Sequence, residues 1–374
     1  MAAFAGGYVL ATALEARGGG LSTPQGAALA YRQVLGDLQQ HYYKPVNVGR
    51  LAQAGINGLL KTLNDPYTEY FTPGEARAFA QMLAGTFSGV GIVLQQKGSL
   101  LQVTSVLPGS PAGQAHIRPG DAIVKVDGVP TAGRSLDVSI AHLQGKAGTT
   151  VHLELQRPGA PGLITLTLTR RELSFPLTSS RLILDHGVKV GYVSLSEFAS
   201  GAGAAVRQDV NGLRKRGAQW IIFDLRDNGG GLVDEAVKVA SEFLPKGAVI
   251  VSTQGLHSAK DISRAGGPGP TTLPMVVLVN GNTASSSEIV AGALKDNKRA
   301  TLIGSRTFGK GVVQEVMPLA GGASLRITVA AYRTPSGADI NHKGIAPTIT
   351  ASSGPAGGKD TVLARALQFI ATGH

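Results

Sequence analysis

Apolar residues along this 374-residue chain change their spacing twice, and each change predicts a different kind of packing. From about 24 to 84 they recur every three to four residues, which is the period of an amphipathic helix. From about 86 they alternate with polar residues, as in half-buried strands. After 173 they form continuous runs such as Trp220–Phe223 and Met275–Val279, with helical stretches between them. Such runs are typical of strands buried on both faces, so the last region predicts a sheet covered by helices.

These changes predict a multidomain protein of mixed α/β class. We expect a helical N-terminal region over 1–85, a β-rich module over 86–172, an α/β domain over 173–350, and a tail with a last helix over 351–374. Within these regions the spacing predicts helices at 135–144, 202–216, 233–244, 285–296 and 361–371.

Composition narrows the classes of function. A hydrophobic content of 43% and a charged content of 16% are typical of a globular protein. The net charge of +11 raises the question of nucleic-acid binding. However, the longest basic cluster is "RKR" at 214–216, without interleaved aromatic residues, so we expect a generally basic surface and no nucleic-acid partner. The absence of cysteine excludes disulfides, cysteine nucleophiles and cysteine-based metal sites.

The opening residues, "MAAFAGGYVLATAL", are apolar over a stretch too short to span a bilayer as a helix. They also lack the positive start of a complete signal peptide. Two interpretations stay open for residues 1–20: a trimmed export signal or membrane anchor, and an ordinary N-terminal helix.

Three consecutive serines stand where an apolar strand is expected to become a helix, in "TASSSEIV" at 283–290. A turn of this kind can expose a nucleophile. Yet the nearest histidines along the chain are His257 and His342. Without further motifs, serines at the start of a helix are most often caps.

The segment "SVLPGSPAGQAHIRPGDAIVKVDG" at 105–128 resembles the PDZ domain family. The resemblance implies that Gly89, Val90, Gly91 and Ile92 form a loop that binds a chain-terminal carboxylate. The two glycines free the backbone so that successive N–H groups can point at an anion. A peptide would then add as a strand beside 91–95, with its apolar last side chain facing the helix expected at 135–144. The alternative is that "GVG" is only the turn that enters a strand.

Further motifs follow the PDZ-like module: "DLRDNGGGL" at 224–232, "SSSEIVAGALKD" at 285–296 and "GSRTFGKGVVQ" at 304–314. Together with that module they resemble the carboxyl-terminal processing proteases, also called tail-specific proteases, over about 26–350. The resemblance implies a crotonase/ClpP-like α/β protease core, a serine endopeptidase with a Ser–Lys centre, and no cofactor or metal. It also implies an extracytoplasmic location in the bacterial envelope or periplasm, with membrane association through the N-terminus if that segment is an anchor.

In this family the nucleophilic serine precedes its lysine by twenty-five positions, which selects Ser285 as the partner of Lys310. A free lysine has a pKa near ~10.4, and burial can lower it to roughly 7–8, where the amine accepts a proton. Gln314 follows four positions later. On a strand this spacing would place both side chains on one face, so that its amide could orient the lysine.

The resemblance places a donor to the oxyanion within the glycine run 229–231. We expect the N–H groups of Gly231 and Ser286 to form the oxyanion hole. We expect Ser287 to cap the helix, and Asp296, near its end, to have a structural role.

One position departs from the family pattern. Gln144 stands where the family usually has an arginine associated with gating, and Lys146 follows two positions later.

Two other classes of protein share parts of this pattern. PDZ-containing proteases with a Ser–His–Asp triad place the protease before the PDZ domain and carry "GNSGG", which is missing here. A non-catalytic PDZ scaffold would have no reason to retain Ser285, Lys310 and Gln314. The sequence therefore predicts an endopeptidase that cleaves proteins near a free, apolar C-terminus. An adaptor or regulatory protein and a homo-oligomer are both compatible with it.

Overall fold

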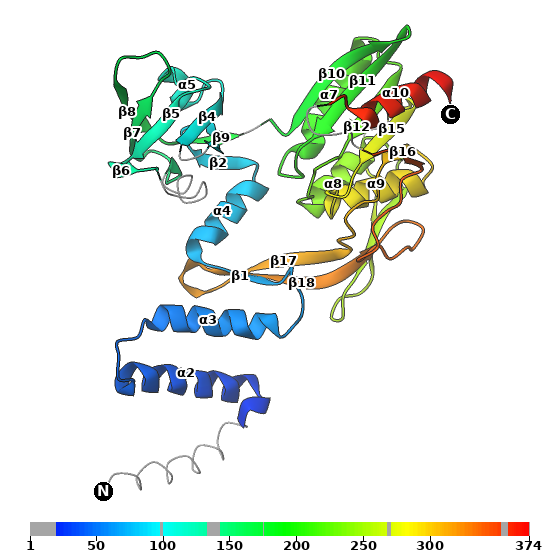
Figure 1. Ribbon diagram of the computed structural model, residues 1–374. Coiled ribbons are helices and arrows are strands. Elements are labelled where there is room, and N and C mark those ends of the chain that lie inside the picture. Colours follow the sequence, from blue (N-terminus) through cyan, green and yellow to red (C-terminus); the bar gives the residue numbers. More distant parts are fainter. Residues whose placement is uncertain are drawn as a thin grey trace, which may run out of the picture. The chain divides into compact units, whose positions relative to one another are not determined.

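The computed structural model describes residues 20–97, 100–132, 143–174, 176–267, 271–352 and 358–373. They belong to two compact units, Met1–Thr72 with Glu315–Thr328, and Pro73–Gln314 with Val329–His374 (Figure 1). The N-terminal segment 1–19 and most of the helix expected at 135–144 lie outside the described residues. The domain boundaries expected at 85, 172 and 350 stay predictions.

In the first unit, two helices are each started by a side-chain cap. They are α2 (Pro24–His41) and α3 (Val48–Lys61), preceded by a short 3-10 turn, η1 (Gly20–Ser22). Thr23 accepts from Gly26 N–H at 3.1 Å, and Asn47 accepts from Arg50 N–H at 3.0 Å. Each cap satisfies one of the N–H groups that a helix start leaves free.

The same unit contains a short strand that the helical pattern does not predict, β1 (Glu69–Phe71). It pairs in antiparallel fashion with the start of β18 (Ser324–Arg333), so that Phe71 lies opposite Ser324. Segment 315–328, far along the chain, therefore completes this unit. It holds the end of β17 (Val312–Pro318) and the 3-10 turn η2 (Ala320–Gly322).

The second unit begins with α4 (Pro73–Leu83) and continues into a module of short antiparallel strands. Six of them form one sheet. Its order is β3 (Ile92–Lys97), β4 (Leu100–Val106), β5 (Ala122–Val126), β7 (Thr150–Gln156) and β8 (Leu163–Thr169), and the short β6 (Val129–Pro130) pairs with β5 beside this path. The other small elements are β2 (Thr86–Gly89), α5 (Pro111–Gln114) and β9 (Arg171–Ser174). In this sheet β3 pairs with β4 and stands at the edge.

The remainder of the second unit is built on a six-stranded sheet. Its order is β10 (Thr178–Asp185), β11 (Val188–Leu195), β12 (Trp220–Asp224), β15 (Met275–Val279), β16 (Thr301–Gly304) and β19 (Ile349–Thr350). All neighbouring pairs are parallel except β10 with β11. A hairpin of β13 (Val249–Gln254) and β14 (Asp261–Arg264) pairs with the end of β18.

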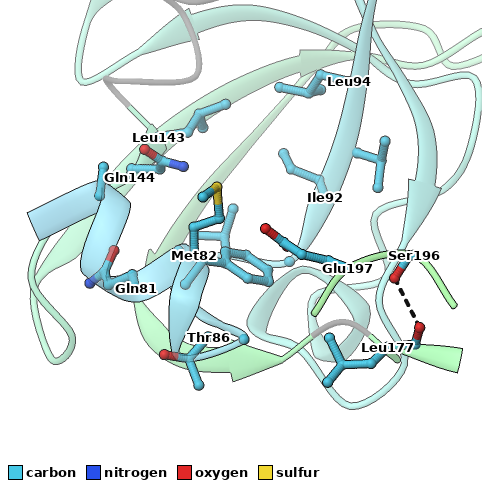
Figure 2. A pocket seen from close by; sticks show the side chains of 17 residues that line it. Gln81, Met82, Thr86, Ile92, Leu94, Leu143, Gln144, Leu177, Ser196 and Glu197 are labelled. Atoms are coloured by element: carbon cyan, nitrogen blue, oxygen red, sulfur yellow. Dashed lines mark hydrogen bonds between the residues drawn. The ribbon is translucent and has the colours of Figure 1, made fainter. Parts of the chain in front are cut away.

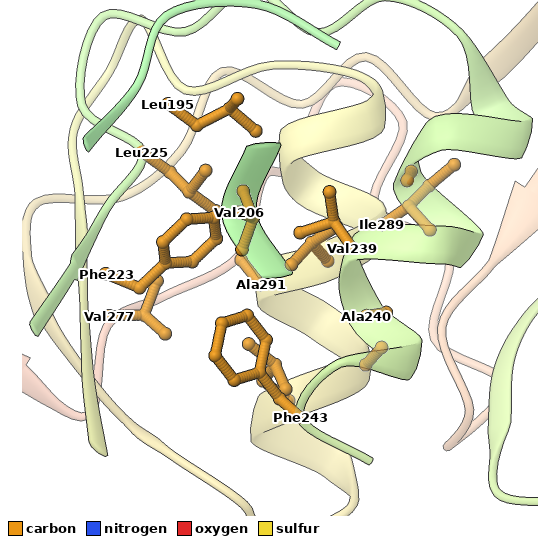
Figure 3. Close-up of a cluster of buried hydrophobic side chains, with 14 of the residues drawn as sticks. Leu195, Val206, Phe223, Leu225, Val239, Ala240, Phe243, Val277, Ile289 and Ala291 are labelled. Carbon is orange, nitrogen blue, oxygen red and sulfur yellow. The ribbon is translucent and has the colours of Figure 1, made fainter. Parts of the chain in front are cut away.

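Helices cover both faces of this sheet. Phe223 and Val277 pack into a cluster with residues of α7 (Ala202–Lys215), α8 (Val233–Ser241) and α9 (Ser286–Asp296), which Figure 3 shows. Their neighbours Ile222 and Val276 point the other way, into a cluster with α10 (Thr361–Thr372). Successive residues of a strand face opposite sides, so a continuous apolar run buries both faces. The expectation of a mixed α/β core with a separate β-rich module is confirmed.

Candidate active site

Ser285 lies between β15 and α9, where the chain turns from strand to helix. Its backbone has φ 56° and ψ −119°, a combination that non-glycine residues rarely adopt. The turn leaves its side chain half-buried, at the positive end of an 11-residue helix. This is the strand-to-helix turn that the three serines predicted, and within 283–287 only Ser285 is not buried.

The other two serines are fully buried, and their hydroxyls donate to carbonyls. Ser286 Oγ donates to Gly231 O at 2.8 Å, and Ser287 Oγ donates to Asn228 O at 3.0 Å. Ser287 therefore ties α9 to the loop that carries the glycine run, whereas we expected it to help cap the helix. Their surroundings leave Ser285 as the serine that a substrate can approach.

Lys310 stands in the loop that precedes β17, and its side chain is half-buried. Its backbone is held close to that of Ser285, because both residues bond to the carboxylate of Glu288 and both lie near the hydroxyl of Tyr332. Gln314 lies on β17, whereas Lys310 is two residues before that strand begins. The premise that one strand carries both side chains therefore does not hold.

The glycine run packs directly against the serine turn. A Cβ on Gly230 would lie 2.9 Å from Ser286 N, so only glycine allows this approach. Phe198 N–H donates to Gly230 O, and Leu232 N–H donates to Phe198 O. The residues on either side of Gly231 therefore bond to Phe198. The N–H and C=O of Gly231 itself point away from Phe198, toward the serine turn. Among the described residues, no acceptor is found for the N–H of Gly231 or of Ser286. These two groups are candidates for the oxyanion hole.

Asn228, which the sequence did not single out, holds this loop in place. It is fully buried, and its side chain donates to Leu195 O at 2.8 Å and accepts from Gly230 N–H at 2.9 Å. Its carbonyl accepts from Ala284 N–H at 3.0 Å. One buried amide therefore connects β11, the glycine run and the turn before Ser285.

A second side chain missed by sequence reasoning is Glu288, which accepts the N–H of Ser285 at 3.0 Å. A signal for it was present, because Ser285 and Glu288 have the S-x-x-E spacing of a capping box.

Two acids, Asp227 beside the glycine run and Asp296 at the far end of α9, are held by hydrogen bonds from polar neighbours. The amides of Asn280 and Asn282 hold the pKa of Asp227 below its usual range. Burial raises the pKa of Asp296, but hydrogen bonds from Thr334 and Ser336 outweigh this and lower it overall.

The predicted carboxylate loop lies between β2 and β3. Gly91 has φ +82°, and a Cβ there would meet Ser110 Cβ at 2.2 Å, so the loop requires glycine. Gly91 O accepts from Leu107 N–H, and Val90 O accepts from Ala112 N–H. Both carbonyls are therefore bonded within the module.

A pocket of about 580 Å³ opens beside this loop and the edge strand β3 (Figure 2). Its walls are mainly apolar and include residues 89–94, Leu143 and Gln144. Met82 of α4, a helix in which the sequence showed no chemistry, also faces it, as does Glu197. Burial raises the pKa of Glu197.

Comparison with known proteins shows which family this chain belongs to. Residues 189–351 match the model of peptidase family S41, and residues 102–157 match a PDZ domain model. A carboxyl-terminal-processing protease of Picosynechococcus is 36% identical over 323 residues, covering 85% of this chain and 77% of the relative. A chloroplastic C-terminal processing peptidase of Tetradesmus obliquus is 40% identical over 332 residues, covering 83% and 71%. The chain belongs to the carboxyl-terminal processing proteases of family S41.

A solved structure agrees with this membership. The photosystem II D1 C-terminal processing protease aligns with a TM-score of 0.52 and 34% identity, covering 89% of this chain and 88% of that one. The predicted family and enzyme class are thus confirmed. No helix within the described ranges is both long and apolar enough to cross a membrane.

Proposed function

We propose that this peptidase uses Ser285 as nucleophile and Lys310 as general base. The observation that carries the proposal is the convergence of two loops 25 residues apart. Ser285 is half-buried and lies at a strained turn. The backbones of Ser285 and Lys310 both bond to the carboxylate of Glu288 and both lie near the hydroxyl of Tyr332. Ser286 and Ser287 are buried and engaged elsewhere, which supports Ser285 as the attacking group.

In this mechanism the neutral amine of Lys310 takes the proton from Ser285 Oγ as that oxygen attacks the scissile carbonyl. The N–H groups of Gly231 and Ser286 stabilise the oxyanion that forms. Lys310 then gives the proton to the leaving amine, and an acyl-enzyme remains. Water, activated by the same amine, hydrolyses that ester. Gln314 has the role of orienting the lysine without adding charge.

We assign recognition of the substrate to the PDZ module. A free terminal carboxylate would be received by the N–H groups of 89–92, while the peptide pairs with β3, the edge strand of its sheet. The apolar pocket beside this edge suits an apolar last residue. Substrates are therefore proteins with free apolar C-termini, cleaved near that end.

The cellular setting belongs to the same proposal. We place the enzyme outside the cytoplasm, in the bacterial envelope, as its resemblance to the tail-specific proteases implies, and the net charge of +11 suits an anionic surface. An adaptor protein and self-association are compatible with this setting. Fractionation of cells that produce the full chain tests the location.

The test of the catalytic centre is cleavage of a peptide with a free apolar C-terminus. We expect Ser285→Ala to be inactive because it lacks the attacking hydroxyl. We expect Lys310→Arg to be inactive because a guanidinium stays protonated throughout the accessible range and cannot act as a base. Wild-type turnover should rise with pH, because the neutral amine is the base. Ser305→Ala and Lys343→Arg are matched controls on neighbouring segments and should keep full activity. A Lys310→Arg enzyme that turns over normally would exclude Lys310 as the base.

A further inference from the structure

Glu288 is a buried carboxylate surrounded by hydrogen-bond donors. Its side chain has no exposed surface. One oxygen accepts from Ser285 N–H at 3.0 Å and Lys310 N–H at 2.9 Å. The other accepts from Gly309 N–H at 2.8 Å and Thr307 Oγ at 2.6 Å. Four donors match the acceptor capacity of a carboxylate ion, which donates nothing.

Tyr332 binds the same two residues through their carbonyls. It is 1% exposed, and its hydroxyl lies 2.6 Å from Lys310 O and 3.1 Å from Ser285 O. Its own N–H donates to Gly311 O, which fixes β18 alongside the lysine loop. The N–H and C=O groups of Ser285 and Lys310 are thus held from two directions.

We propose that Glu288 and Tyr332 are positioning residues that set the separation of the nucleophile and the base. The proposal rests on the assignment of Ser285 and Lys310 above. Neither side chain contacts the reacting atoms in this role. Proton transfer requires near-contact distances, and a misplacement of about 1 Å can cost about 100-fold in rate. An uncompensated buried charge is expensive, so a carboxylate that meets four donors is suited to fixing a geometry.

The competing explanation is that Glu288 only caps α9. A cap would need the N–H of Ser285 alone, whereas three of the four donors come from 307–310. A purely structural role would lower stability and leave turnover of the folded enzyme unchanged. A positioning role lowers kcat and the rate at which Ser285 reacts, with little change in KM.

The experiment compares Glu288→Gln and Tyr332→Phe with two matched controls in the same core. Glu235→Gln alters another buried carboxylate, which accepts from Gly203 N–H at 2.8 Å. Tyr192→Phe removes another buried hydroxyl, which donates to Asp224 at 2.7 Å. The readouts are kcat and KM on a free-acid peptide, the rate of Ser285 labelling by a fluorophosphonate, and the midpoint of thermal unfolding.

We expect Glu288→Gln to lower kcat and the labelling rate about 100-fold, and Tyr332→Phe about tenfold, with KM within about threefold of wild type. The controls should lower the unfolding midpoint comparably and keep kcat and labelling within about twofold. Wild-type kcat in folded Glu288→Gln or Tyr332→Phe overturns the proposal. Tyr332→Phe removes one oxygen from a buried ring, so it decides the question if Glu288→Gln does not fold.

Failure of this inference is distinguishable from failure of the catalytic assignment. If Ser285→Ala still cleaves and labels, the assignment of the nucleophile is wrong. If Ser285→Ala and Lys310→Arg are inactive while both positioning variants behave as wild type, only the present inference fails.

Discussion

Ser286 and Ser287 differ from Ser285 in that each has a buried hydroxyl bonded to a carbonyl of the glycine-run loop. Ser286→Ala leaves the carbonyl of Gly231 without this donor, a loss worth about 1–3 kcal/mol of stability. Ser287→Ala is milder, because Asn228 O retains the N–H of Ala284. We expect both variants to keep kcat/KM within about tenfold, since the N–H of residue 286 survives, whereas Ser285→Ala should lose at least about 1,000-fold.

Peptide-cleavage assays with all three variants measure this ranking. An inactive Ser286→Ala beside an active Ser285→Ala would show that the catalytic register is wrong by one residue.

Between β2 and β3, the turn at Gly91 depends on the absence of a side chain. Gly91→Ala would place its Cβ 2.2 Å from Ser110, which caps α5. Gly109→Ala is the matched control, because Gly109 also has positive φ, +71°, but has open space around its Cβ position. We expect Gly91→Ala to raise KM for a free-acid peptide at least about tenfold and Gly109→Ala to change it less than about threefold, with strain of about 1–3 kcal/mol in each. Fluorophosphonate labelling should stay normal in both.

Steady-state kinetics and urea unfolding of the two variants separate the effect of the contact with Ser110 from the effect of a side chain at positive φ. Equal changes in KM would mean that backbone strain alone, and no contact with Ser110, governs the loop.

The N-cap of helix α10, Asp360, adds an ion pair to the apolar contacts that the helix makes with the core. Asp360 accepts two hydrogen bonds from Arg226, at 2.8 Å each, and one from Leu363 N–H at 3.0 Å. Chiefly through the bond from Arg226, the pKa of Asp360 is lowered from its ordinary 3.8. A lowered pKa stabilises the fold above the ordinary value, and this stabilisation is lost as pH falls through the folded value.

We expect Asp360→Ser, which keeps the helix cap, to cost about 0.5–1 kcal/mol at neutral pH, because the carboxylate is 42% exposed. Asp360→Ala should cost about 1 kcal/mol more, since the cap is lost too. Urea unfolding at several pH values measures both. The difference between wild type and Asp360→Ser should shrink below about pH 4. If that difference stayed constant down to pH 2, the ion pair would not be its source.

At the scale of the whole molecule, recognition of the chain end and cleavage are assigned to different modules of the second unit. Charge-assisted hydrogen bonds to a carboxylate contribute about 1.5–3 kcal/mol each, against about 1 for neutral ones. An amidated C-terminus loses the charge and presents N–H donors to the donors of the loop. We expect at least a tenfold loss in kcat/KM, or about 1.4 kcal/mol.

Matched free-acid and amidated peptides of one sequence provide the measurement. A fall in kcat at saturation as well as in affinity would show that the module also regulates the catalytic centre. Equal cleavage of the two peptides would reject recognition of the free C-terminus and leave the roles of Ser285 and Lys310 untouched.

The sequence by itself determined the features that depend on neighbours along the chain. Alternation in "TVHLELQ" and continuous apolar runs such as "MVVLV" predicted half-buried and fully buried strands, because side-chain direction follows residue number within one strand. Ordered motifs at set spacing identified the family and singled out Ser285 and Lys310.

Tertiary structure alone decided which distant groups meet. Nothing in local pattern places Glu288 on the Lys310 backbone or Tyr332 beside both Ser285 and Lys310. The same holds for the pairing of segment 315–328 with β1 and for the place of Met82 in the apolar pocket beside β3. The same reason explains the different outcome for Ser287, whose partner carbonyl is 59 residues away. A cap is a local preference, and a buried hydroxyl takes whichever partner the packed loops supply.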